Sequence, residues 1–166
     1  MRVEIKLTVQ PQRLGQGRNF YCRRALCDVY FASTKEELLS EPPLSTWALV
    51  DTGSHFGVMP MGLIRQVSDR RSADRVLVPP SSDEGLRFLQ GLCGDPVPCS
   101  LWNVFVWVHD TKMKNWKKLT LQVKVPEDPE AMPRCILGFA GFLEKGRSVI
   151  NFARLPGLIP VAHIDL

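Results

Sequence analysis

The sequence predicts an all-β protein, and three stretches of chain carry that prediction. Residues 101–108 are rich in β-branched and aromatic side chains, which are typical of a strand. Residues 119–125 alternate apolar and polar side chains, and residues 1–9 do the same, as half-buried strands do. We therefore expect a closed or nearly closed β-barrel, with short helical turns in its loops.

Length and composition fit a single domain over residues 1–166. Hydrophobic residues make up 45% of the chain and charged residues 23%, an ordinary balance for a soluble globular protein. No apolar run is long enough to cross a bilayer, so no membrane partner is expected. The alternating start of the chain reads as a strand rather than a signal peptide, and the expected location is the cytoplasm.

Further elements are expected between these strands. Ser33 and Glu36 have the spacing of a capping box, which predicts one or two helical turns after residue 33. Pro60 suits the first position of a second short helix. Additional strands are predicted at residues 20–22, 25–31, 47–50, 75–78, 86–89 and 149–152.

The five cysteines give no zinc-type pair, and their odd number favours free thiols in a reducing compartment. Cys93 and Cys99 flank a Gly-Asp-Pro turn, so a disulfide between them stays open as the alternative. The three histidines are scattered and none lies beside a cysteine. No metal and no other cofactor is expected.

The net charge of +4 is mild. Its main cluster, residues 112–118, holds four lysines and a tryptophan between two predicted strands. A solvated hairpin turn explains this cluster better than a nucleic-acid site does, since lysines also protect exposed sheet edges. No nucleic-acid partner is expected.

The most informative stretch is residues 47–54, Trp-Ala-Leu-Val-Asp-Thr-Gly-Ser. A buried strand that stops at Asp51 delivers a carboxylate to the strand end, where the chain must turn. Gly53 permits the turn and lets that carboxylate accept backbone N–H bonds. An ordinary strand-to-turn junction with a solvated aspartate remains the simpler alternative.

A second stretch of sequence favours a functional role for Asp51 over an ordinary strand-to-turn junction. Ile136-Leu137-Gly138 is followed by Phe142-Leu143 and then by the strand-like residues 149–152, Val-Ile-Asn-Phe. Together with Asp51-Thr52-Gly53-Ser54, in this order and with sheet-forming sequence between them, these motifs resemble the retropepsin-like aspartic proteases, the single-domain, dimeric relatives of the pepsins. The resemblance covers about residues 45–153.

The resemblance implies that Asp51 is catalytic. Metal-free amide hydrolysis can use two nearby carboxylates that share one proton, one activating water and the other protonating the carbonyl oxygen. The chain has one Asp-Thr-Gly, so the second carboxylate must come from Asp51 of another copy in a twofold homodimer. By the same resemblance Thr52 braces the dimer, Gly53 and Ser54 lie close to the substrate backbone, and residues 136–138 pack beneath the Asp51 loop.

A flap is expected around residues 89–99, where the family carries a hairpin that closes over an extended peptide. Its candidate hinge and contact residues are Gly91, Leu92, Gly94 and Val97, with Phe56, Val58 and Trp102 as further subsite candidates. Two features depart from the family. Pro96 and Pro98 stiffen the hairpin, and Ser54-His55 replaces the residues that usually follow the motif.

The function expected from these observations is an aspartic endopeptidase that acts on peptide or protein substrates as a homodimer. The first alternative is a catalytically inactive barrel used for peptide binding or dimerisation. The second is an unrelated β-domain, in which residues 136–137 would lie away from the Asp51 loop. The apolar tail, residues 155–166, either supplies an intersubunit strand or packs on its own barrel.

Overall fold

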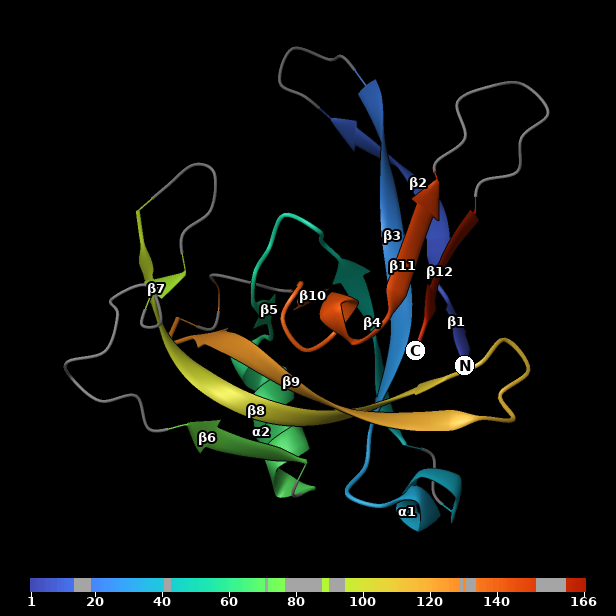
Figure 1. The fold of residues 1–166 in the computed structure, drawn as a ribbon. Coiled ribbons are helices and arrows are strands. Elements are labelled where there is room, and N and C mark those ends of the chain that lie inside the picture. Colours follow the sequence, from blue (N-terminus) through green and yellow to red (C-terminus); the bar gives the residue numbers. More distant parts are fainter. Residues whose placement is uncertain are drawn as a thin grey trace.

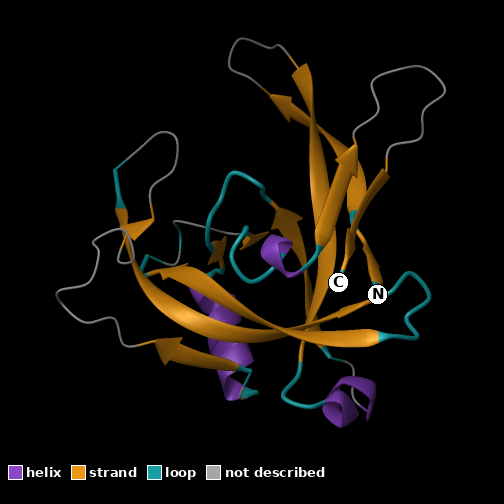
Figure 2. Cartoon of the chain, in the orientation of Figure 1, coloured by secondary structure: helices purple, strands orange, loops and turns teal. Residues whose placement is uncertain are grey.

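The computed structural model is mostly β, as expected, and most of its strands belong to one large sheet (Figures 1 and 2). It describes residues 1–13, 19–40, 43–70, 72–76, 88–89, 95–128, 130, 134–151 and 161–166, with backbone alone for 9–13, 19–23 and 161. The strands are β1 (Arg2–Glu4), β2 (Lys6–Arg13), β3 (Asn19–Phe31), β4 (Leu44–Val50), β5 (Gly57–Val58), β6 (Ala73–Val76), β7 (Phe88–Leu89), β8 (Val97–His109), β9 (Trp116–Pro126), β10 (Cys135–Leu137), β11 (Arg147–Asn151) and β12 (Val161–Asp165). The helices are α1 (Lys35–Ser40), α2 (Met61–Asp69) and the 3₁₀ turn η2 (Leu143–Lys145).

The large sheet has the strand order β2-β3-β4-β10-β5-β9-β8-β6, with β7 paired to β8. A further pairing joins β3 back to β8 through Tyr30 and Trp107. The long β8–β9 hairpin crosses the lower part of the molecule in Figure 1, and α2 lies against it beside β6. Strand β9 turns one face to the core because its side chains alternate: Leu119, Leu121 and Val123 all enter the core.

A second, three-stranded sheet brings the two ends of the chain together. Its order is β1-β12-β11, with both pairings antiparallel. The Met1 ammonium donates to the carbonyl oxygen of Leu166 over 2.7 Å, and Arg2 forms an ion pair with Asp165 at 2.8 Å. Of the two alternatives for the tail, its last strand therefore pairs with its own chain.

Two local expectations need correction. Residues 1–9 form two strands rather than one, because the chain changes partner: β1 and the N–H of Ile5 bond to β12, whereas Lys6 onward pairs with β3. The cap of α1 is also shifted by one residue. Thr34 Oγ1 accepts the N–H of Glu37 at 3.2 Å, while the Glu37 carboxylate accepts the N–H of Ser33 at 2.8 Å.

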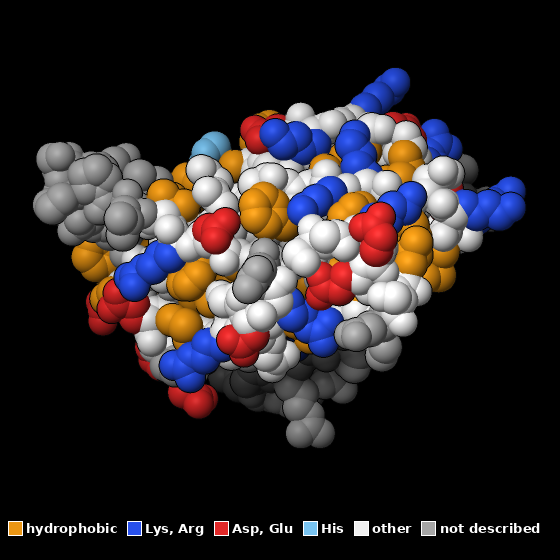
Figure 3. Space-filling view, turned by 90° about the horizontal axis from the view of Figure 1, so that it is seen from below, with side chains coloured by type: hydrophobic (Ala, Val, Ile, Leu, Met, Phe, Trp, Pro, Cys, Tyr) orange, Lys and Arg blue, Asp and Glu red, His pale blue; other side chains and the backbone are white. Residues whose placement is uncertain are grey.

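The basic cluster at residues 112–118 includes the turn of the β8–β9 hairpin. The carboxylate of Asp110 accepts the N–H of Lys114 at 2.9 Å and the side-chain amide of Asn115 at 2.6 Å. Seen from below, Lys and Arg side chains are interspersed with Asp and Glu over the surface (Figure 3). No helix in the described ranges is long and apolar enough to cross a membrane.

Candidate active site

Asp51 lies at the end of β4, directly beside β10. The two strands are parallel, with Ala48 opposite Cys135 and Val50 opposite Leu137. The ladder continues one step past the strand end, because the N–H of Asp51 donates to the carbonyl oxygen of Leu137 at 3.0 Å. The two sequence motifs are therefore in direct contact.

The loop from Asp51 to Phe56 passes over the end of β10. Strand β10 lies between β4 and β5, so the chain must cross it to pass from one to the other. The segment after β10 returns two hydrogen bonds to this loop, from Phe139 N–H to the Ser54 carbonyl at 2.8 Å and from Ala140 N–H to the His55 carbonyl at 2.7 Å. The loop is thus held on both sides by main-chain bonds.

Gly138 is required by the close approach of these two segments. A Cβ atom at this position would lie 2.4 Å from the carbonyl oxygen of Phe56 and 2.8 Å from that of Ser54. Both atoms are backbone and neither can rotate away. Residue 138 therefore packs directly beneath the loop, together with Leu137.

Within the loop, short hydrogen bonds fix the acid and the turn. Gly53 N–H donates to Asp51 Oδ1 at 2.9 Å, which is the backbone contact expected from the sequence. The hydroxyl of Ser54 donates to the carbonyl oxygen of Phe56 at 2.6 Å. The carboxylate is oriented by the amide beside it, and the serine is used to close the turn.

The outer side of the loop is open. Thr52 and His55 are exposed, and the hydroxyl of Thr52 has no partner within the described part of the chain. Phe139, which follows Gly138, is 49% exposed although it is a large apolar residue. The ring of His55 packs edge-on against Phe56 with centroids 4.8 Å apart.

The subsite candidates differ in how far their side chains are exposed to solvent. Phe56, Val97 and Trp102 are half-buried, and the indole N–H of Trp102 donates to the hydroxyl of Ser100 at 2.9 Å. Val58 is only 2% exposed and pairs with both Ile136 and Lys124. Val58 therefore offers no surface to a ligand here, and its assignment as a subsite residue is corrected to a core role.

The expected flap is described only at its base. Strand β7 pairs with the start of β8, with Phe88 opposite Pro98 and Leu89 opposite Val97. Gly91, Leu92 and Gly94 lie outside the described residues, as does Cys93, so the alternative of a Cys93–Cys99 disulfide stays open. Pro96 is exposed and precedes β8.

Sequence reasoning missed one residue of this region, Lys124 on β9. It is 8% exposed, and its ammonium donates to the carbonyl oxygen of Phe88 at 2.7 Å. The same nitrogen lies 5.2 Å from the centroid of the Phe56 ring. A lysine at the polar positions of an alternating strand gives no local sign that distant segments cover it.

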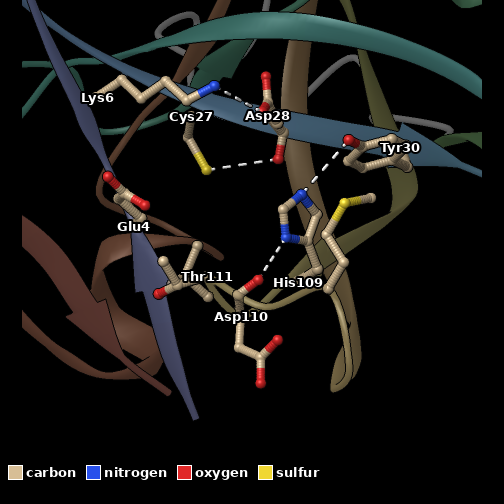
Figure 4. Close-up of a pocket in the computed structure, with 10 residues that line it drawn as sticks. Glu4, Lys6, Cys27, Asp28, Tyr30, His109, Asp110 and Thr111 are labelled. Atoms are coloured by element: carbon tan, nitrogen blue, oxygen red, sulfur yellow. Dashed lines mark hydrogen bonds and ion pairs between the residues drawn. The ribbon is translucent and has the colours of Figure 1, made fainter.

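A separate hollow of about 250 Å³ lies between β1, β3 and the β8–β9 turn (Figure 4). It shares no lining residue with the Asp51 loop. Four of its polar side chains are engaged: Asp28 is paired with Lys6 at 3.4 Å, and the His109 ring contacts the carbonyl oxygen of Asp110 at 2.6 Å and the Tyr30 hydroxyl at 3.4 Å. In Figure 4 the Asp110 carboxylate points away from the hollow, toward its own turn.

Within the described residues, no three His, Cys, Asp or Glu side chains are grouped to hold a metal ion. What the Asp51 loop can offer chemically is one oriented carboxylate per chain, at an open strand end. Comparison with known proteins adds no relative: no family model, no curated protein and no solved structure matches the chain.

Proposed function

We propose that the protein is a retropepsin-like aspartic endopeptidase, active as a homodimer. The observation that carries this proposal is the contact between the two motifs, where Asp51 continues the parallel ladder of β4 and β10 by its bond to Leu137. An accidental pair of motifs has no reason to meet at the carboxylate. Motifs that lay apart would have supported the unrelated-domain alternative.

In the proposed mechanism, two Asp51 carboxylates face each other across a twofold axis and share one proton. The ionised carboxylate takes a proton from a bound water, and the water oxygen attacks the peptide carbonyl. The protonated carboxyl donates to the carbonyl oxygen, which gives a neutral tetrahedral intermediate. Because the carboxylates interact strongly, the pair titrates as a unit.

Several features of the loop suit this use. The Gly53 amide restrains Asp51 Oδ1, and within the described ranges Oδ2 has no hydrogen-bond partner. The exposed Thr52 and Phe139 lie on the open side of the loop, where a second copy would approach. A twofold axis at this point makes each residue meet the same surface of its partner.

We also propose that the large sheet closes into the family's barrel. Strand β3 pairs with β4 on one side and touches β8 on the other through Tyr30 and Trp107, which supports closure. The substrate would be an extended peptide between the Asp51 loops and the β7–β8 hairpin. Buried thiols at Cys27 and Cys135 suit a reducing compartment such as the cytoplasm.

The test is cleavage of a mixed peptide library between pH 4 and 7, read by mass spectrometry. Wild type is compared with Asp51→Asn at concentrations where sedimentation shows a dimer. New cleavage sites that disappear in the variant support the proposal and map the specificity. An intact library with a dimeric wild type overturns it as a general protease and favours the inactive peptide-binding module.

A further inference from the structure

Lys124 occupies a position that its strand would normally leave in water. Along β9 the inward residues are Leu121, Val123 and Val125, while Thr120 and Gln122 on the other face are exposed. Lys124 belongs to that second face, yet it is only 8% exposed. Something other than the sheet itself must therefore cover it.

Two parts of the candidate active site lie against its ammonium. On one side the Lys124 ammonium donates to the carbonyl oxygen of Phe88, in the strand β7 that begins the hairpin. On the other side the ammonium lies near the Phe56 ring, at the end of the Asp51 loop. A single cation thus contacts both the hairpin base and the loop.

The backbone of Lys124 is tied to the same place. Its carbonyl oxygen accepts the N–H of Met59 at 3.0 Å, and Lys124 is the register partner of Val58 in β5. Since β5 directly follows the Asp51 loop, the lysine stem rises from the strand that borders it. Because the Lys124 backbone is fixed beside the loop and its ammonium is bonded to the hairpin, the lysine can fix the distance between the two.

We propose that Lys124 is a positioning residue that anchors the β7–β8 hairpin to the Asp51 loop and so sets the binding of extended peptides. This inference rests on the proposed function for its effect on catalysis, but not for the anchoring itself. Its carbonyl contact is charge-assisted and largely shielded from water, which is where such a bond is strongest. Removing the charge frees the hairpin base without touching the acid.

Strand β9 provides a matched control in Lys118. Its ammonium also donates to a backbone carbonyl, that of Ser33 at 2.8 Å, and lies 4.7 Å from the Phe105 ring centroid. Lys118 is exposed, however, and its partners Ser33 and Phe105 lie outside the Asp51 loop and outside the paired base of the hairpin at residues 88–89 and 97–98. Lys118→Met and Lys124→Met therefore delete the same chemistry at two places on one face.

The first measurement is hydrogen exchange by mass spectrometry. We expect Lys124→Met to speed exchange about tenfold or more in peptides that contain residues 88–89 and 97–100, with β2 and β3 unchanged. Lys118→Met should leave those peptides as in wild type, and Lys124→Arg should restore most of the protection. Equal exchange in wild type and a folded Lys124→Met would overturn the anchoring.

A second measurement uses the wild type alone, so it does not depend on how well a variant folds. Brief acetylation of the native protein, mapped by peptide, should modify Lys124 at least about fivefold more slowly than Lys118, because both ammonium groups bond to a carbonyl oxygen but only Lys124 is buried. Equal rates would overturn the proposal.

The link to catalysis is read last, on a peptide cleaved by the wild type. Lys124→Met should raise KM about threefold or more with a smaller change in kcat, because the hairpin holds substrate and is not a reacting group. Unchanged KM with faster exchange would overturn the effect on peptide binding and leave the proposed protease standing. No cleavage by a dimeric wild type would count against the proposed function, while exchange and acetylation would still decide the anchoring.

Discussion

The N–H of Asp51 lies 3.0 Å from the carbonyl oxygen of Leu137 and donates to it. This bond extends the parallel pairing of β4 and β10 by one residue, to the position where β4 ends and the loop begins. The carboxylate is therefore placed by a sheet, which is rigid, rather than by the loop alone. Catalytic groups gain precision when rigid elements hold them in this way.

Gly138→Ala should destabilise the fold by about 1–3 kcal/mol, the usual cost of forcing an extra carbon into a packed site. The added Cβ would meet the backbone oxygens of Phe56 and Ser54, and both belong to the Asp51 loop. Urea unfolding followed by fluorescence gives the free energy of unfolding.

Gly62→Ala is the matched control for that substitution. Gly62 is exposed on α2, and a Cβ there would meet no atom within 4 Å. Alanine in a helix should stabilise by about 0.5–1 kcal/mol through the lower entropy of the unfolded chain. If both glycines tolerate alanine equally, the contact of Gly138 with the loop is not as close as described.

Asp51→Asn should lower kcat/KM at least about 10³-fold, since the proposed homodimer would lose both its general acid and its general base at once. The fold should survive, because the asparagine oxygen can still accept the Gly53 N–H. Rates on one peptide from the library, with thermal melting in parallel, separate the two effects. Asp69→Asn, at an exposed position on α2, should leave both unchanged; a similar loss there would mean that the effect is not specific to the loop.

The strands were predictable where alternation is local. Residues 101–108 and 119–125 lie inside β8 and β9, which run on to Val97–His109 and Trp116–Pro126 because each strand supports the other along the hairpin. The contact between the Asp51 loop and β10 was predictable only through the family resemblance. No feature of residues 47–54 by themselves specifies which distant strand will pair with them.

The features that the sequence did not predict also depend on contacts between segments that are distant in the chain. Residues 1–9 divide into two strands because β1 pairs with β12, far along the chain, while Lys6 onward pairs with β3. The buried Lys124 contacts Phe88 in β7 and the ring of Phe56, and neither is near it in sequence. Val58 was expected to line a subsite because it follows Asp51 closely in the sequence, but strands β9 and β10 enclose it.

The cap of α1 predicts a pH dependence of stability. The hydroxyl of Ser33 and then its N–H donate to the Glu37 carboxylate and lower the pKa of Glu37. Because the folded pKa lies below the unfolded one, the cap stabilises the protein above the unfolded pKa of about 4.3. This contribution is lost as the pH falls through the folded pKa.

Glu37→Gln should therefore destabilise by about 0.5–1 kcal/mol at pH 7, a value kept small because this carboxylate is well solvated. The difference from wild type should shrink as urea unfolding is repeated toward pH 3. The exposed neighbour Glu36 serves as control, and Glu36→Gln should change little at any pH. A Glu37→Gln penalty that is the same at pH 3 and pH 7 would contradict the role of the charged carboxylate.

Cys27 and Cys135 flank Ala48 across three neighbouring strands, and both are buried. Burial is the main cause that raises the pKa of each thiol to about 12. Only about one molecule in 10⁴ carries either thiolate at pH 8, and the thiolate is the species that reacts with alkylating reagents. Iodoacetamide should therefore leave both residues unmodified in the native protein for hours and modify both in urea, as read by peptide mapping. Rapid native alkylation of either would show that β3, β4 and β10 open locally beneath the Asp51 loop, which conflicts with a loop placed by a rigid sheet.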